Sequence, residues 1–470
     1  MTTQTIAGDR PGGTTATWLG HPLGLYLLFA TEMWERFSYY GMRALLTLTV
    51  VAATTDANPG FGWSDADALV LYGWYTGLVY FTPVIGGWLA DNFIGQRRSV
   101  IIGGLVMAAG QFTLAYAVPG SITLFYVGLG LIVIGNGFFK PNISTMVGDL
   151  YREGDARRDG AFTIFYMGIN AGAFLAPLVC STLGESAAWG WRFGYFAAGS
   201  GMLLSVVIQL LLAQRFLGDI GVQPSARRAL AASGGKHEPL TREEWDRLRV
   251  IFVLFVFIVL FWASFEQAGG LMNLYASEKT DRYLTATYEM PAGYFQAANP
   301  MFIIILGPIF AAVWSRLGAV GRNPPTPIKM ILGLVFTAIG FVFMVGAVFD
   351  QEAHGKASMV WLVLAYLLHT MGELCISPVG LSMVTKLSPP RLASVMMGVW
   401  FLINFFANLL QGYIGAQAGR FGELTIFSGI AVVLAVFAAI LWTISGKLVT
   451  WMHGAEEIKE PPPAVDEIAA

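Results

Sequence analysis

The chain has 470 residues, of which 55% are hydrophobic and 12% are charged, and its formal net charge is -2. A soluble domain carries about 25% charged residues, so this composition argues against a large water-soluble protein. It also gives no reason to expect nucleic acid as a partner. Cys180 and Cys375 lie inside apolar runs, so neither a disulfide framework nor a metal site is expected.

The polar and apolar stretches alternate along the chain in a pattern typical of a polytopic membrane protein. Residues 1–18 are polar and lack the order of a cleaved signal peptide. A spanning helix needs about 20 mostly apolar residues, and twelve stretches meet that need. The predicted helices cover residues 21–51, 67–90, 99–118, 122–147, 161–182, 192–213, 250–275, 294–317, 328–349, 359–386, 393–418 and 424–452.

A polar gap divides the twelve predicted helices into two sets of six. We therefore expect an N-terminal tail at 1–18, an N-terminal six-helix bundle at 19–214, a cytoplasmic linker at 215–249, a C-terminal bundle at 250–453 and a C-terminal tail at 454–470. That tail contains three consecutive prolines, and its composition predicts disorder. Two six-helix halves joined by a linker are the architecture of the major facilitator superfamily, whose binding site lies between the halves.

The distribution of basic residues predicts the orientation in the membrane. The connections after the even-numbered helices carry Arg97, Arg98 and Arg152, whereas the first connection on the other side carries Asp56 and Asp65. Basic loops stay in the cytoplasm. Both termini are therefore expected in the cytoplasm. The chain itself is expected to be a multi-pass protein of the cell membrane, and a bacterial inner membrane is the favoured location.

The connection between the second and third helices contains a recognisable motif. Residues 86–98 read Gly-Gly-Trp-Leu-Ala-Asp-Asn-Phe-Ile-Gly-Gln-Arg-Arg. This run resembles the loop motif of the superfamily, Gly-x-Leu-Ala-Asp-x-x-Gly-x-Arg. Small residues such as Gly86 let two helices approach closely. The alternative is an ordinary glycine-rich turn followed by cytoplasmic arginines.

The first helix carries more charge than a lipid-facing helix can hold. Burying one ionised side chain at mid-bilayer costs about 2.5–3.5 kcal/mol on insertion scales, so such residues are usually functional and paired. At about 100° per residue, four polar or charged side chains of this helix form one stripe, and two more flank the stripe. They are Glu32, Arg36, Tyr39 and Arg43, flanked by Glu35 and Tyr40. This stripe is expected to line a wet cavity, and the alternative is a structural network that locks helices together.

Three further charges lie in apolar helices of the two halves. Lys140 and Glu373 occupy the fourth helix of their respective halves, and Glu266 lies in the seventh helix. Pseudo-symmetry therefore places a cation on one wall of the cavity and an anion on the other, an arrangement that suits a zwitterion. Carboxylates that exchange partners also suit proton coupling, because breaking a salt bridge in an apolar site favours protonation of the acid.

These segments resemble the proton-dependent oligopeptide transporter family. The family signature Glu-x-x-Glu-Arg-Phe-x-Tyr-Tyr-Gly matches residues 32–41 completely. Residues 162–172 of the fifth helix and 372–400 of the tenth and eleventh helices resemble its other signatures. The resemblance covers nearly the whole chain between the tails. It implies a symporter that imports di- and tripeptides with protons by alternating access, works as a monomer in membrane lipid, needs no cofactor or metal and is not an enzyme.

The resemblance also implies a role for each matching residue. Proton coupling would rest on Glu32, Glu35, Arg36 and Glu266. The peptide carboxylate would bind Arg43 and Lys140, and the peptide amine would bind Glu373. Asn170 and Asn299 would bind the peptide backbone, and the side-chain pockets would be lined by Tyr39, Tyr40, Tyr72, Trp262 and Trp400. Arg43–Glu266 would close an outer gate and Lys140–Glu373 an inner one. Simple packing remains the alternative for both tryptophans, and a helix–helix hydrogen bond for Asn170.

The sequence departs from the family in two places. Animal members carry a histidine after a tyrosine in the second helix, but here Tyr72 is followed by Gly73, so proton transfer must rest on carboxylates. His369, one turn before Glu373, is a weaker proton candidate. The gap between the halves is also too short for the two extra helices of many bacterial members.

Four other functions stay open at the level of sequence. A transporter of nitrate would need positive charge without an amine receptor, so Glu373 argues against it. The complete coupling signature argues against a passive uniporter, and the scattered histidines argue against a metal-dependent membrane enzyme. A receptor or scaffold role is compatible with the sequence.

Overall fold

A computed structural model describes residues 16–152, 155, 157–224, 240–389 and 392–455. Most of the predicted N-terminal tail, the middle of the linker and nearly all of the C-terminal tail, including its predicted disorder, lie outside the described residues. In the described part, twelve long helices form at the twelve predicted places. They are α1 Leu23–Val51, α2 Asp65–Leu89, α3 Gln96–Ala117, α4 Ile122–Asp149, α5 Arg157–Gly184, α6 Trp191–Leu217, α8 Arg242–Phe265, α10 Ala298–Ala319, α11 Thr326–His354, α12 Met359–Leu387, α13 Ala393–Ala416 and α15 Glu423–Trp451.

Short elements connect or extend these helices. β1 pairs antiparallel with β2 before α1, and β3 pairs parallel with β4. Their bounds, with those of the short helices, are β1 Thr17–Trp18, β2 His21–Pro22, η1 Ala90–Ile94, η2 Glu266–Gly269, α9 Leu271–Glu278, β3 Thr280–Asp281, η3 Ala292–Ala297, β4 Ala357–Ser358 and α14 Ala418–Phe421.

The helices are apolar enough for a multi-pass membrane protein. In the described part of the chain, eleven helical segments have the length and composition of a membrane span. The helix missing from that set is α1, which carries Glu32, Glu35, Arg36 and Arg43 on an otherwise apolar segment. These four side chains are buried within the protein, so α1 can cross the bilayer without exposing them to lipid.

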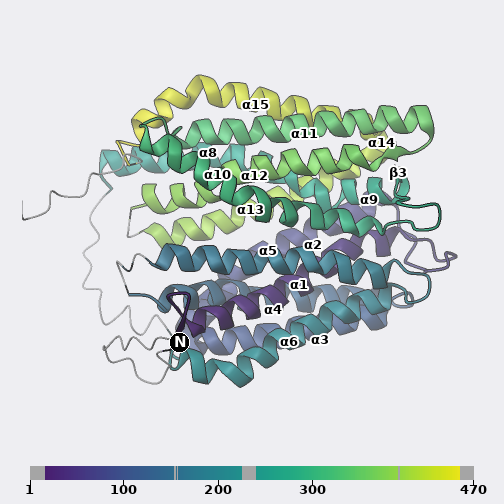
Figure 1. Cartoon of the computed structure of the whole chain (residues 1–470), viewed down its shortest axis with the longest axis horizontal. Helices are drawn as coiled ribbons and strands as arrows, with labels where there is room; N and C mark the ends of the chain where they lie inside the picture. The colour runs from purple at the N-terminus through teal and green to yellow at the C-terminus, as the bar shows by residue number, and fades with distance from the viewer. Residues whose placement is uncertain (1–15, 153–154, 156, 225–239, 390–391, 456–470) are drawn as a thin grey trace, which may run out of the picture.

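The helices form two bundles that lie side by side (Figure 1). In the first, α1 packs against α5 and α6, and α3 packs against α4 and α6. In the second, α11 packs against α12 and α15. The bundles meet along α2 and α13, and α5 packs against η3 and α10. This arrangement confirms the predicted all-α fold with two six-helix halves.

The seventh predicted helix differs from expectation at both ends. It begins at Arg242 rather than at residue 250, because a capping box extends it into the polar segment. The Thr241 hydroxyl accepts from the Glu244 amide at 3.2 Å, and the Glu244 carboxylate accepts from the Thr241 amide at 2.9 Å. The helix then breaks at Glu266–Gly269, where a 3-10 turn leads into the short helix α9.

The glycine-rich motif brings two helices into backbone contact. A Cβ atom at Gly86 of α2 would collide with the carbonyl of Gly137 on α4. Within the motif, the Arg97 guanidinium donates to the Gln214 side chain at 3.0 Å and to the Gly218 carbonyl at 3.1 Å. The motif therefore ties the connection between α2 and α3 to α4 and to the end of α6.

Candidate functional site

A cavity lies between the two halves, near the middle of the helices. Its walls come from α1, α2, α5, α8, η2, η3, α10 and α12. Among its lining residues are seven of the residues predicted from the sequence: Tyr40, Arg43, Asn170, Trp262, Glu266, Asn299 and Glu373. Cationic and anionic groups thus face one space from opposite halves of the molecule.

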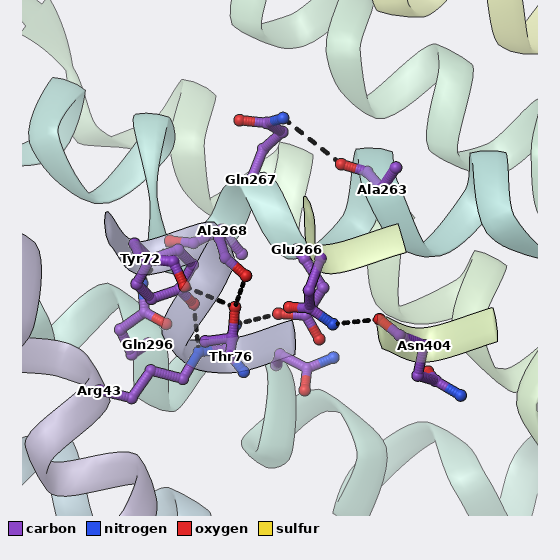
Figure 2. A network of polar contacts seen from close by, with 12 residues as sticks. Arg43, Tyr72, Thr76, Ala263, Glu266, Gln267, Ala268, Gln296 and Asn404 are labelled. Carbon is purple, nitrogen blue, oxygen red and sulfur yellow. Dashed lines mark hydrogen bonds and ion pairs between the residues drawn. The ribbon is translucent and has the colours of Figure 1, made fainter. Parts of the chain in front are cut away.

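Arg43 connects the two halves at one end of this cavity. Its Nη2 atom forms an ion pair with Glu266 Oε2 at 2.5 Å, and its Nε atom donates to the Tyr72 hydroxyl at 2.5 Å. Figure 2 shows Arg43 pointing toward Tyr72 and Glu266. The helix break makes room for this contact, because a Cβ atom at Gly269 would collide with the Tyr72 hydroxyl. Tyr72 itself belongs to this junction and not to the cavity wall.

The signature residues of α1 form a buried charge cluster beside the cavity. The Arg36 Nε atom lies 3.1 Å from Glu32 Oε1 and also forms an ion pair with Glu35. The Asn136 amide of α4 donates to Glu35 Oε1 at 3.4 Å. Within the described chain, Glu32 Oε2 and Arg36 Nη2 are buried without a hydrogen-bond partner. The cluster therefore keeps one acceptor and one donor free for a proton or a ligand.

Both tyrosines of the signature lie against arginines. The Arg36 Cζ atom is 5.4 Å from the ring centroid of Tyr39, and the Arg43 Cζ atom is 5.6 Å from that of Tyr40. The two rings meet edge to face at 5.2 Å. Only Tyr40 reaches the cavity wall, whereas Tyr39 is buried behind it.

Lys140 and Glu373 have separate partners in this structure. The Lys140 ammonium lies over the ring of Tyr80, 3.9 Å from its centroid. Glu373 Oε2 accepts from the Asn299 amide at 2.8 Å, and the same amide donates to the Thr370 hydroxyl at 3.0 Å. Of the ion pairs between described residues, none joins Lys140 to Glu373. The outer pair of the predicted gates is thus formed and the inner pair is apart.

The remaining predicted binding residues fall into two groups. The Asn170 amide donates to the Tyr166 carbonyl in the preceding turn at 2.9 Å and lines the cavity. Trp262 also lines it, and its indole N–H is buried without a partner among the described residues. Trp400 is outside the cavity wall and packs against Phe255, with ring centroids 6.3 Å apart.

Sequence reasoning missed several polar residues of the cavity. Tyr80, Tyr166, Gln296, Tyr366 and Ser377 all line it. Each lies in an apolar helix or next to one, where a single tyrosine or serine is indistinguishable from a packing residue. Which of them face the cavity depends on the rotation of each helix, and only the long-range packing fixes that rotation.

At the end opposite the N terminus, which carries β3 and α9 in Figure 1, polar contacts join the halves. The Asn273 amide donates to the Ala44 carbonyl at 3.0 Å and to the Thr47 hydroxyl at 3.3 Å. The hydroxyls of Thr182 and Tyr294 lie 2.6 Å apart. These contacts, together with the Arg43–Glu266 pair, join the two halves at that end.

Among the described residues, no candidate metal centre accompanies the charge clusters. Within the described ranges, no group of three or more histidine, cysteine, aspartate or glutamate side chains is arranged to hold a metal ion.

The sequence matches a family model described as PTR2, POT family, over residues 97–233 and 237–426. The chain belongs to the POT family. This result confirms the resemblance drawn from the first-helix signature and establishes the chain as a transporter-family protein. Membership agrees with the eleven candidate spans among the described residues, and together they identify a multi-pass membrane protein.

Relatives in the POT family cover almost the whole chain. The "Uncharacterized transporter YclF" of Bacillus subtilis is 36% identical over 93% of this chain and 96% of its own length. The "Peptide transporter YePEPT" of Yersinia enterocolitica is 36% identical over 92% of this chain and 95% of its own. The "Dipeptide and tripeptide permease A" of Escherichia coli is 30% identical over 91% and 93%.

Solved structures confirm the major facilitator fold of the POT family. A crystal structure of a peptide transporter POT in complex with sulfate superimposes with a TM-score of 0.85 at 35% identity, covering 94% of this chain and 98% of that one. A POT family transporter in complex with a thioalcohol-conjugated peptide gives a TM-score of 0.83 at 28% identity, with coverage of 92% and 98%.

Proposed function

We propose that this POT-family chain is a proton-coupled symporter that imports di- and tripeptides by alternating access. The observation that carries the proposal is the cavity between the halves, which has Arg43 on the wall from α1 and Glu373 on the wall from α12. A short peptide is a zwitterion whose charged ends lie several ångströms apart, and this pair of walls complements it. The relatives include a di-/tripeptide transporter and a dipeptide and tripeptide permease, which supports the same substrate class.

The peptide's two ends bind different halves in this proposal. Arg43 and Lys140 of the first half hold the carboxylate, and Glu373 of the second half holds the amine. Asn170 and Asn299, which line the cavity from α5 and α10, bind the peptide backbone. Tyr40 and Trp262 contact the peptide side chains, with Tyr39, Tyr72 and Trp400 supporting these pockets from behind.

The buried cluster of α1 is the proposed coupling site. Glu32 and Glu35 share Arg36, so protonation of one carboxylate leaves the arginine with the other. A proton that enters the cluster thereby releases Arg36 from one partner. Glu266 couples the same way through Arg43, since a neutral Glu266 no longer attracts the guanidinium.

The two ion pairs act as gates on opposite sides. Arg43–Glu266, which joins α1 to η2, seals the outer side, and Lys140–Glu373 seals the inner side when it forms. In this proposal both termini lie in the cytoplasm, as the basic loops indicate, and the Arg43–Glu266 pair closes the outer side of an inward-facing state. In this proposal, the protein works as a monomer in the lipid bilayer, and its two bundles, residues 19–214 and 250–453, rotate against each other during transport. Protons are the only coupling ion required.

Uptake of labelled dialanine into proteoliposomes tests this function. With the outside more acidic than the inside, wild-type protein is expected to concentrate the dipeptide, and collapse of the pH gradient is expected to abolish accumulation. Nitrate at the same concentration should leave the rate unchanged. If nitrate is accumulated instead of dialanine, the alternative of a small-anion transporter replaces the proposal.

A further inference from the structure

The end of the molecule opposite the N terminus holds a second charged contact between the halves, in addition to the Arg43–Glu266 pair. Glu185 follows the last residue of α5, and its carboxylate reaches across to the first turn of η3. Its Oε2 atom accepts from the Ala292 amide at 2.6 Å, and its Oε1 atom accepts from the Gly293 amide at 2.8 Å. Both oxygens are thus used on backbone donors of the opposite half.

The position of Glu185 is fixed by the first half alone. Its backbone amide donates to the Ser181 carbonyl at 2.9 Å, which continues the last turn of α5. The Asn58 side chain donates to the Gly184 carbonyl at 2.7 Å, and Asn58 Oδ1 accepts from the Trp191 amide at 3.2 Å. The connection between α1 and α2 therefore holds the connection between α5 and α6, and this bracing orients the carboxylate before it meets the other half.

The second half presents its backbone without a side chain in the way. A Cβ atom at Gly293 would collide with the Ser181 hydroxyl, and it would lie 3.0 Å from Glu185 Oε1. Ala292 is completely buried. Glycine at position 293 is therefore required for η3 to approach α5 closely enough for both amides to reach one carboxylate.

The two backbone amides are free to bind this carboxylate because of where they lie. The first amides of a helix have no partner within the helix, and a carboxylate that accepts from backbone N–H groups forms charge-assisted hydrogen bonds, which are stronger than neutral ones. η3 leads directly into α10, which carries Asn299 of the cavity wall. A contact that holds η3 also holds the start of α10.

We propose that Glu185 is a positioning residue of the transport cycle, a latch that closes the outer end by holding η3 and α10 against α5. The inference rests on the proposed alternating-access function and adds a second charged outer contact, which shares no residue with the Arg43–Glu266 pair. Opening of the outer side requires the two amides of η3 to separate from Glu185. The latch adds to the stability of the inward-facing state without contacting the peptide or the coupling cluster.

Distance measurements between spin labels test the latch without any substrate. The labels are placed by Thr55→Cys and Lys356→Cys, on exposed loops at the outer ends of the two halves, after Cys180 and Cys375 are replaced by alanine. In Glu185→Gln, one oxygen can still accept, but the amide nitrogen cannot accept from the second N–H. The ratio of long to short distances should rise about tenfold, as expected for the loss of a charge-assisted hydrogen bond.

The matched control is Glu352→Gln, which removes an exposed carboxylate at the same end of the molecule. The control should leave the distance distribution unchanged. An unchanged distribution in Glu185→Gln, or an equal shift in both variants, overturns the latch. The distances are measured without peptide, so they do not depend on transport activity. If the wild-type protein fails to transport dialanine, the proposed function is contradicted, but the distance result for Glu185 still holds.

A second variant tests the same contact from the other half if Glu185→Gln does not fold. Gly293→Ala should shift the distribution in the same direction, because its Cβ atom pushes η3 away from Ser181. Adding Ser181→Gly removes the colliding atom and should return the distances toward those of the wild type. If Gly293→Ala keeps the wild-type distribution, or if Ser181→Gly gives no rescue, the proposed contact does not control the outer end.

Discussion

At the scale of single residues, Glu373 is held by neutral groups. The Asn299 amide donates to it at 2.8 Å, and no described cation forms an ion pair with it. The carboxylate is buried and faces the cavity. A buried carboxylate without a cation is costly. An incoming ammonium group therefore gains more binding free energy here than at a site where an arginine already neutralises the acid.

Glu373→Gln should therefore cripple peptide uptake by removing the anion that binds the peptide amine. The test compares dialanine with its N-acetylated form in competition for uptake. Acetylation removes the positive charge, so wild-type protein should lose affinity for the acetylated peptide much more than the variant does. Equal losses in the two proteins would show that Glu373 does not recognise the amine. Glu352→Gln serves as the control, with uptake unchanged.

Substitution of Glu32 or Glu35 should abolish proton coupling while peptide binding is kept. Gln at either position keeps the shape of the side chain but cannot cycle a proton. Accumulation of dialanine under a pH gradient is expected to be lost, whereas counterflow exchange, which needs no net proton movement, should survive at least in part. Normal accumulation in both Glu32→Gln and Glu35→Gln would contradict the assignment of the coupling cluster.

At the scale of elements, the break between α8 and α9 positions Glu266 for the proposed outer gate. The 3-10 turn Glu266–Gly269 presents Glu266 toward Arg43, and Gly269 leaves room for Arg43 and Tyr72 (Figure 2). A continuous helix would carry side chains into that space. Because the pair is buried on both sides, loss of one partner leaves an uncompensated charge, which costs about 3–5 kcal/mol.

Glu266→Gln should shift the protein toward the outward-open state at neutral pH, because it imitates a protonated carboxyl. Spin labels on the outer ends of the halves should report longer distances than in the wild type. A distance distribution in this variant equal to that of the wild type at every pH from 5 to 8 would contradict the gate, although peptide transport itself would remain possible by another route.

Close packing of α2 on α4 depends on one glycine of the loop motif. In Gly86→Ala, the new Cβ atom meets the Gly137 carbonyl of α4, and overpacking of this kind costs about 1–3 kcal/mol. The melting temperature in detergent should fall. Gly87→Ala is the matched control, because its Cβ atom would sit at an ordinary 3.4 Å from Pro141. Equal melting temperatures for the two variants would contradict this account of the motif.

At the scale of the whole molecule, local sequence signals predicted the helices well. Long apolar runs determine where helices cross a bilayer, and the stripe of Glu32, Arg36 and Arg43 indicated an interior face of α1. The signals for the cavity were weaker, because Tyr80 and Tyr366 face it only through the packing of the two halves. The separation of Lys140 from Glu373 was also beyond prediction, since it depends on which state of the cycle the chain adopts.

The halves are joined at one end by several independent contacts and are free to separate there only when all of them break. Arg43–Glu266, Asn273–Ala44 and Thr182–Tyr294 each bridge the halves at the end away from the N terminus. Individually such contacts contribute modestly. Together they favour one closed state, and a transporter of this design requires that proton and peptide binding outweigh their sum.

The central claim is that peptide and proton move together through this chain. It is tested most directly by proton uptake into liposomes that contain the purified protein, when dialanine is added outside without a starting pH gradient. Dialanine should acidify the liposome interior, and Glu32→Gln should abolish this acidification. Dialanine entry with no movement of protons, or no dialanine entry at all, would contradict it.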